Sequence, residues 1–348
     1  PYVPTAAGFT AAGMLSPLAE LDTVEPAVAA LGWRSIALWR DIAAALPQRP
    51  MFRSEGSLML AHREDLGAAQ RVLERLRTAC ETQAWQNLSP PEGVQPLELA
   101  RLRELEPALQ GPAHAWLLPG EGQLDAVAMM MALHDDSPGA QWHWSRPVRC
   151  VEENGTLHFA DGGQTAFDAV IDTRGVGAQA SRQGACASAS PVFDVRGVRG
   201  EVIWLQAPAH GLTRLTRLLH PRHGVYIVPR SPDLLLIGAS ELETEDRSPA
   251  SLRSTVELLA AAHSAMPALA EARILRLDVN LRPALPDNNP CTEWRGRCLR
   301  INGLFRHGFM ISPAVTGAAV RLVGALFAGN DIPESDETSG LPYIRAAN

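Results

Sequence analysis

Three separated stretches of this 348-residue chain combine residue types that could bind a small polar ligand. The first is a small-residue run over 11–17, whose glycine would let the backbone pass close to a flat molecule. In the second, a predicted strand, Tyr226 and Arg230 would share one face by the two-residue period and present a phenol and a guanidinium. The third joins Arg282 to a glycine-bearing loop and helix start over 302–313.

Each stretch alone also has a plain structural explanation. The small residues could form a packing turn, and the strand could be an ordinary half-buried surface strand. Arg282, which precedes Pro283, could make a structural ion pair. The individual residues therefore leave both interpretations open.

A phosphate-binding glycine loop would normally read G-x-G-x-x-G between a strand and a helix. Gly175-Val176-Gly177 follows a predicted strand over 168–173, but Arg182 and its neighbours supply no usable third glycine. A tight turn after a buried strand is favoured over a phosphate cradle at this position.

Composition restricts the classes of protein further. The net charge of −7 and the pI of about 5.8 argue against nucleic acid as a partner. We find neither an apolar run long enough for a membrane helix nor a signal peptide. Five cysteines without a C-x-x-C pair indicate neither a metal site nor a disulfide framework, so we expect a cytoplasmic protein.

Alternating helices and strands indicate an α/β or α+β enzyme with a strand-rich middle. Asn154-Gly155 predicts a hairpin with a type I′ turn, in which both residues have positive φ. Ser312 and Pro313 predict the start of the last helix. The main expected helices cover residues 27–46, 64–80, 124–134, 251–265 and 312–328, and the main expected strands cover 56–61, 148–151, 156–159, 168–173, 200–206, 225–229 and 234–239.

Six short runs together resemble one known family. In order they are A-A-G-M-L-x-P, R-G-E-V, Y-I-V-P-R, I-G-A-S, L-R-P-x-x-x-D and G-L-x-R-H-G-F-x-x-x-P. Their order and spacing resemble the D-amino-acid oxidase superfamily of FAD-dependent oxidoreductases, most closely its glycine oxidase branch linked to thiamine biosynthesis. The resemblance covers nearly the whole chain.

The resemblance implies a two-domain fold. A Rossmann-like FAD-binding domain would comprise residues 1–50, 118–192 and 284–348. An antiparallel-sheet substrate domain would comprise 51–117 and 193–283. We expect the first strand, glycine loop and helix of the FAD domain, about 30 residues, to be missing from the sequence as given.

The resemblance also implies which residues contact FAD. The run from Ala11 through Ala12 and Gly13 to Met14 would lie along the flavin and pyrophosphate. Val148 would meet the adenine, and Gly175 would end the strand beneath the pyrophosphate. The flavin pyrimidine edge would face the loop made of Arg306, His307, Gly308, Phe309 and Met310.

By the same resemblance, Arg282 would hold the substrate carboxylate with two parallel hydrogen bonds, and the Tyr226 hydroxyl would assist. Arg306 would be a second carboxylate ligand or would order its loop. The implied reaction oxidises glycine or a similar small amine to an imine, which water converts to an oxo acid and ammonia, while dioxygen becomes hydrogen peroxide. Two places before the tyrosine, where the family sometimes has histidine, this chain has Gly224, with His223 one residue further back.

Other functions compete with this one. The same fold could oxidise N-methylated or larger secondary amines, or pass electrons to an acceptor other than oxygen. A flavin-free binding or scaffold role is the alternative if the N-terminal segment is truly absent. We expect no metal, no nucleic acid and no membrane partner, and the sequence leaves room for a homo-oligomer.

Overall fold

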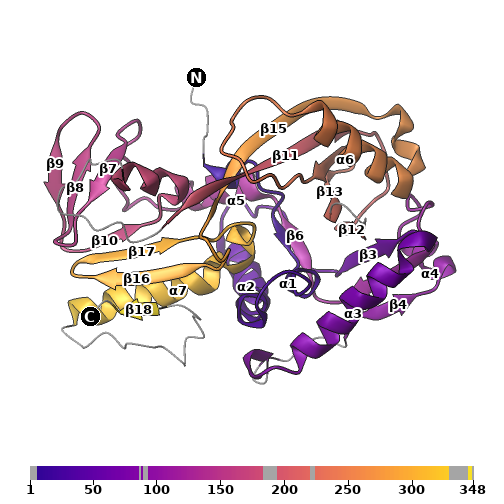
Figure 1. Cartoon of the computed structure of the whole chain (residues 1–348), viewed down its shortest axis with the longest axis horizontal. Coiled ribbons are helices and arrows are strands. Elements are labelled where there is room, and N and C mark those ends of the chain that lie inside the picture. The colour runs from indigo at the N-terminus through magenta and orange to yellow at the C-terminus, as the bar shows by residue number, and fades with distance from the viewer. Residues whose placement is uncertain are drawn as a thin grey trace.

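Figure 1 shows the computed structural model, in which two lobes flank a central group of helices. It describes residues 6–85, 88, 93–182, 194–219, 224–328 and 344–346, with side chains for all except 180–182 and 344–346. The mixed α/β class expected from the sequence is confirmed. The domain boundaries stay a prediction.

The larger lobe is built on an eight-stranded sheet with the order β15-β11-β14-β13-β12-β3-β5-β4. We expected this sheet to be antiparallel, and all of its pairs are, except that β12 runs parallel to β3. A long stretch of chain separates those two strands, so no hairpin forces them to run in opposite directions. Its strands are β3 (Ser57–Ala61), β4 (Gln95–Leu97), β5 (His114–Leu118), β11 (Arg196–Gln206), β12 (Thr216–Leu219), β13 (Gly224–Ser231), β14 (Leu234–Gly238) and β15 (Arg273–Ala284).

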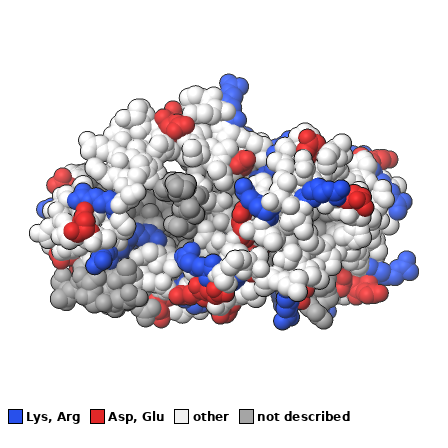
Figure 2. Space-filling model, turned by 90° about the horizontal axis from the view of Figure 1, so that it is seen from above, with Lys and Arg blue, Asp and Glu red and all other residues white. Residues whose placement is uncertain are grey.

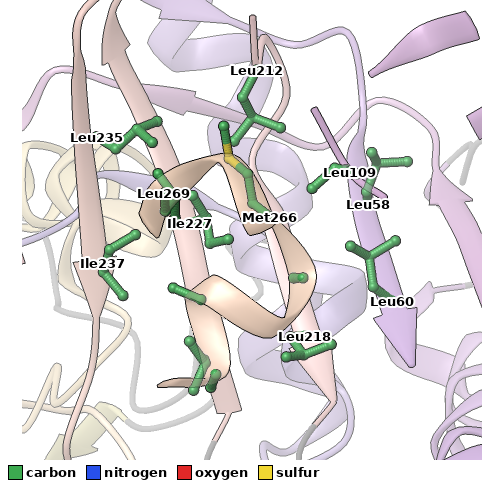
Figure 3. Packing of buried hydrophobic residues seen from close by; sticks show 14 of the residues in the cluster. Leu58, Leu60, Leu109, Leu212, Leu218, Ile227, Leu235, Ile237, Met266 and Leu269 are labelled. Carbon is green, nitrogen blue, oxygen red and sulfur yellow. The ribbon is translucent and has the colours of Figure 1, made fainter. Parts of the chain in front are cut away.

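The two faces of this sheet have different neighbours. On one face, helix α6 (Leu252–Ala265) and the turn after it cover a core that includes Leu58, Ile227 and Met266 (Figure 3). Ser251 caps α6 by accepting a hydrogen bond from the Ser254 N–H at 3.2 Å. The opposite face packs against the segment that contains Ala12 and Met14. The alternation of side chains along β13 therefore sends Ile227 to the helix-covered core and Tyr226 to the other face.

The smaller lobe contains a four-stranded sheet with the order β10-β17-β16-β18. Strands β10 and β17 are parallel, β16 and β17 form a hairpin, and β18 is parallel to β16. The long helices α2 (Pro26–Ala45) and α7 (Gly308–Phe327) share a core with this sheet. Its strands are β10 (Val170–Asp172), β16 (Cys291–Arg295), β17 (Cys298–Asn302) and β18 (Ile344–Ala346).

Helix α7 corrects the statement that no apolar run could span a membrane. By length and composition it passes that test, because an 18-residue window of this 20-residue helix has a mean hydropathy of 1.6. The face that carries Met310, Ile311 and Val315 packs in the core shared with α2, as a central helix of a folded lobe would.

Two small three-stranded sheets and further helices complete the described chain. In the hairpin of β7 and β8, Gly155 has φ of 88°, but Asn154 does not have positive φ, so the type I′ turn was wrong. The loop instead spans 152–155, and the Asn154 side chain accepts a hydrogen bond from the Thr156 N–H. These elements are β1 (Met14–Leu15), α1 (Pro17–Glu20), β2 (Phe52–Arg53), α3 (Leu66–Cys80), α4 (Leu99–Leu105), β6 (Gly122–Leu124), α5 (Ala126–Asp135), β7 (Val148–Val151), β8 (Thr156–Phe159) and β9 (Gln164–Ala166), with short 3-10 turns at Ala7–Phe9, Arg63–Asp65, Gln83–Trp85, Gly175–Arg182 and Pro267–Glu271.

Cysteine usage differs from the expectation in one respect. Cys150, buried on β7, is disulfide-bonded, whereas Cys80 and Cys298 are free. Spacing along the sequence did not reveal this bond, because a disulfide requires only that two cysteines be close in space.

Candidate active site

Arg282 and Tyr226 approach each other across the eight-stranded sheet, although two strands lie between them. Arg282 extends from β15 over Gly200 of β11, where an added Cβ would collide with the guanidinium. Its Nη1 donates hydrogen bonds to the carbonyl oxygens of Ser240 at 3.1 Å and Arg199 at 3.3 Å. The absence of a side chain at position 200 thus lets the guanidinium reach the end of β14.

Tyr226 reaches the same place from the other side. It pairs with Gly238 of β14, and a Cβ on that glycine would lie 2.5 Å from the tyrosine hydroxyl. Burial raises the pKa of Tyr226, although the positive charges of Arg282 and Arg306 oppose that change. The phenol therefore keeps its proton and can donate a hydrogen bond to a ligand above β14.

Arg282 is suited to an anionic ligand. Burial lowers its pKa, because a desolvated guanidinium loses the water that stabilises its charge. Among the described residues its hydrogen-bond acceptors are neutral carbonyl oxygens. A carboxylate would supply the missing counter-charge and could accept two hydrogen bonds in parallel.

Arg306 is already paired with two carboxylates. Its Nη1 lies 3.3 Å from Glu241 Oε2. Its Nη2 lies 3.2 Å from Oε1 and 3.1 Å from Oε2 of Glu20, and the first of these contacts is a hydrogen bond. Burial alone would raise the pKa of Glu20, but Arg306, Arg217 and His307 outweigh it and lower the pKa to about 2. Glu20 is therefore a buried anion within the site.

The run from Ala11 to Met14 lies against the same face of the sheet. Arg230 holds it there by donating hydrogen bonds to the carbonyl oxygens of Ala12 and, at 2.7 Å, of Leu124. Tyr226 and Val228 belong to the apolar cluster that contains Ala12 and Met14. Gly13 has φ of 60°, and an added Cβ would collide with the carbonyl of Leu124. The glycine is thus required for the close backbone approach.

The predicted start of the last helix is wrong. Helix α7 begins at Gly308, so Pro313 lies inside it rather than at its first turn. Proline has no N–H to bond the carbonyl four residues earlier, that of Phe309. Trp39 Nε1 donates to this carbonyl instead, at 2.6 Å. This substitute donor allows the helix to start before the proline.

The first turn of α7 carries the residues expected at the flavin pyrimidine edge. His307, the N-cap residue, makes no side-chain cap, so backbone N–H groups at Gly308, Phe309 and Met310 point out of the helix end. Burial lowers the pKa of His307 to about 4, against the pull of Glu20, so the ring is neutral at pH 7. The helix end is a suitable place for negative charge.

Val148 and Gly175 form a separate group on the smaller lobe. The Val148 carbonyl accepts a hydrogen bond from Arg174 at 3.1 Å. Gly175 has φ of 55°, and its carbonyl accepts from Asn302 Nδ2 at 3.0 Å. Gly175 also lies close to the strand that carries Arg282, because a Cβ added to the glycine would be 3.4 Å from Cγ of Pro283.

A pocket lies beside Tyr226 and Arg306. It has about 330 Å³ of empty space, part of it open solvent, and is lined by Met14, Ser16, Glu20, Tyr226 and Arg306 among others. Ser16 Oγ, which lines the pocket, is buried without a hydrogen-bond partner among the described residues. This hydroxyl and the uncapped end of α7 are suited to a polar ligand such as part of a flavin.

Sequence reasoning missed several residues that shape the site. Glu20 and Arg217 line the pocket, yet neither belongs to a motif by residue type alone. Gly200 and Gly238 lie in runs that were recognised, but their role as space for Arg282 and Tyr226 appears only once the strand register is known. An acidic residue ending an apolar segment, as Glu20 does after Pro17-Leu18-Ala19, was the available signal.

An arginine with neutral hydrogen-bond acceptors, a phenol and an uncapped helix end on a mixed α/β fold suit a flavin-dependent oxidoreductase. The model of the family described as FAD dependent oxidoreductase (DAO) matches residues 2–321, and the chain belongs to this family. The enzyme is thus an FAD-dependent oxidoreductase.

Individual members of the family and solved structures are also similar to this chain. The chain is 36% identical over 317 residues to a Rhizobium etli protein assigned as the thiamine biosynthesis oxidoreductase ThiO, covering 91% of this chain and 84% of that protein. It is 30% identical to the glycine oxidase of Geobacillus kaustophilus, covering 96% and 84%. A crystal structure of that oxidase aligns with a TM-score of 0.76 at 28% identity, covering 94% of this chain and 87% of the other. The iminodiacetate oxidase of Chelativorans sp. BNC1 aligns with a TM-score of 0.77 at 20% identity, covering 99% and 90%, which shows a shared fold.

Proposed function

We propose that this protein oxidises glycine or a similar small amino acid, with dioxygen as the electron acceptor. The observation that carries the proposal is the meeting of Arg282 and Tyr226 above the end of β14, which provides a cation and a neutral hydrogen-bond donor for one carboxylate. The relatedness to a glycine oxidase and to a ThiO supports the choice of a small amine.

The residues would act by binding and orientation. Arg282 and Tyr226 would fix the α-carboxylate, while the segment from Ala11 to Met14 and the first turn of α7 would hold FAD. When bound, FAD supplies the two-electron redox chemistry. The neutral His307 and the ion pair of Arg306 with Glu20 would hold the loop before α7 in place and would not transfer a proton.

In the balanced reaction, the substrate loses two electrons and two protons as its carbon–nitrogen single bond becomes an imine. Water then releases an oxo acid and ammonia, and dioxygen takes up the electrons and protons to form hydrogen peroxide. Secondary amines remain the rival substrates, because the pocket wall at Gly224 carries no side chain to exclude an N-substituent.

The test is the visible spectrum of the FAD-loaded protein mixed anaerobically with glycine, sarcosine and a larger secondary amine. Bleaching of the flavin band by glycine or sarcosine, followed by peroxide formation on admission of oxygen, is the expected result. A flavin band that no amine bleaches would overturn the proposal. Bleaching without peroxide would remove oxygen as the acceptor and keep the amine.

Arg282→Ala tests the residue assignment. We expect the affinity for carboxylate inhibitors to fall by about 2–5 kcal/mol, because the variant removes the charged partner of a desolvated carboxylate. Equilibrium titration followed by the flavin band measures this change. Arg273→Ala, on the exposed start of the same strand, is the matched control and should leave the affinity as it is. Unchanged affinity in Arg282→Ala would remove that residue from the site.

A further inference from the structure

A further arginine lines the pocket beside the proposed carboxylate site. Arg217 on β12 is directly opposite Tyr226 on β13, so the two side chains lie on the same face of the sheet. Both line the pocket together with Arg306. Only 14% of the Arg217 side chain is exposed. The guanidinium is thus placed to meet a ligand rather than bulk water.

Arg217 uses little of its hydrogen-bonding capacity on the described residues. Its Nη1 donates to the Ala19 carbonyl and lies 3.8 Å from Glu20 Oε1, without a hydrogen bond to that carboxylate. The Glu20 carboxylate lies between Arg217 and Arg306, and its closer contacts are to Arg306. A guanidinium has five N–H donors in a planar fork. A ligand could therefore engage Arg217 without displacing its contact with Ala19.

The wall beside this guanidinium is open. Gly224 lies two residues before Tyr226 and shares its face of β13, and a Cβ there would lie 3.4 Å from Arg217 Nη2 and 3.6 Å from Nε. Any larger side chain at this position would cover the guanidinium from the pocket side. His223, the residue one further back, lies outside the described residues.

The cations in and beside the pocket are unequally paired. Arg306 has close contacts with both Glu20 and Glu241. Arg217 has only the more distant contact with Glu20, and Arg282 donates to neutral carbonyl oxygens. Glu121, which also faces Arg217, is held partly protonated near neutral pH because burial raises its pKa to about 7.

A single substrate carboxylate held by Arg282 would therefore leave Arg217 with only its 3.8 Å contact to Glu20, whose closer contacts are to Arg306. Buried charges without partners are costly, so the pocket favours a ligand with two negative groups.

We propose that Arg217 forms a second anion subsite, and that the preferred substrate is an amino acid carrying a second carboxylate, either on its nitrogen or on its side chain. This inference rests on the proposed function, because Arg282 and Tyr226 must take the α-carboxylate for the second acid group to reach Arg217.

Two matched pairs of compounds test the subsite on the FAD-loaded protein. The first pair is N-(carboxymethyl)glycine and its monoamide, in which one of the two carboxylates becomes an amide. The second pair is D-aspartate and D-asparagine. Members of a pair have nearly the same shape and differ in one charge. We expect the wild type to prefer the diacid of at least one pair, in kcat/KM and in anaerobic equilibrium affinity. In Arg217→Met this preference should fall about 10- to 100-fold, the range of a hydrogen bond to a charged group.

The ratio within a pair separates recognition from a purely structural role. If Arg217 only supports α1 through Ala19, Arg217→Met will weaken both members equally and the ratio will stay constant, which overturns the proposal. Gly224→Leu should also reduce the diacid preference by covering the guanidinium while its charge remains. This second variant decides the question if Arg217→Met does not fold. Arg253→Met, on the exposed face of α6, is the control and should keep the wild-type ratio.

Failure of the subsite and failure of the proposed function give different results. If the wild type treats each diacid like its amide but sarcosine or glycine still bleaches the flavin, the subsite is wrong and the amine oxidase stands. If no amine bleaches the flavin, the proposed reaction is wrong. The equilibrium affinities then still decide whether Arg217 distinguishes two acid groups from one.

Discussion

At the scale of single residues, the most informative groups are two buried carboxylates with opposite pKa changes. Glu20 ends the short helix α1 and faces Arg306 and Arg217, while Glu121 accepts hydrogen bonds from the Leu18 N–H at 2.6 Å and the Ala19 N–H at 2.9 Å. Guanidinium groups lower one pKa, and burial raises the other. Helix α1 thus ends in the anion Glu20, while its N–H groups at Leu18 and Ala19 are bound by Glu121, which titrates near neutral pH.

Glu20 should stabilise the fold above its unfolded-state pKa and lose that contribution as the pH falls. The pKa drops from 4.5 to about 2 on folding, so the free energy of unfolding should decrease by about 3 kcal/mol between pH 5 and pH 2 on this account. Urea unfolding at several pH values measures it. In Glu20→Gln the decrease of the free energy of unfolding between pH 5 and pH 2 should be smaller by this amount. If the variant loses stability with falling pH as the wild type does, Glu20 is not the titrating group.

Glu121 should behave in the reverse manner. Its pKa rises from 4.5 to about 7 on folding, so its contribution is fully present below pH 4.5 and is lost as the pH rises through 7. Glu121→Gln keeps the shape and removes the buried charge. We expect the variant to be more stable than the wild type at pH 8, by up to about 3 kcal/mol, and similar at pH 4.5. Thermal unfolding at both pH values is the measurement, and a variant that is less stable at pH 8 would contradict it.

At the scale of elements, strand register positions the substrate-binding side chains through glycines on neighbouring strands. Gly200→Ala should push the Arg282 guanidinium away from the end of β14, because the new Cβ would occupy its place. We expect kcat/KM for carboxylate substrates to fall about 10- to 100-fold, while the protein stays folded. Steady-state kinetics and circular dichroism check both statements. Gly139→Ala, where no atom lies within 4 Å, is the control; equal kinetics in the two variants would show that position 200 does not place Arg282.

Periodicity and turn residues predicted several elements well, for physical reasons that are local, but they did not predict β15, the strand that carries Arg282. The helix at Pro26–Ala45 and the strands at Ser57–Ala61, Val148–Val151 and Thr156–Phe159 lie within a residue or so of their predicted bounds. The start of α7 was missed because Trp39, remote in sequence, supplies the donor that Pro313 lacks. No local pattern contains that contact.

At the scale of the whole molecule, the family resemblance predicted the fold and placed Arg282, Tyr226 and Arg306 in one region. It did not include Glu20 or Arg217, because their importance comes from the charges that surround them in the folded protein. The polarity of the surface is easier to anticipate from composition. Figure 2 shows acidic and basic side chains interspersed over the face in view, without a continuous basic surface.

Arg230 also has a consequence for how the site is assembled. Its guanidinium joins β13 to carbonyl oxygens 106 and 218 residues away along the chain. Contacts of such high sequence separation must overcome the entropy of closing long loops, so they form slowly and late in folding. The consecutive strands β12, β13 and β14 can pair before Ala12 and Leu124 are in place, but the ligand site cannot exist until they are. An intermediate with most of its secondary structure would therefore be unable to bind flavin, and recovery of flavin binding would be among the last events of refolding.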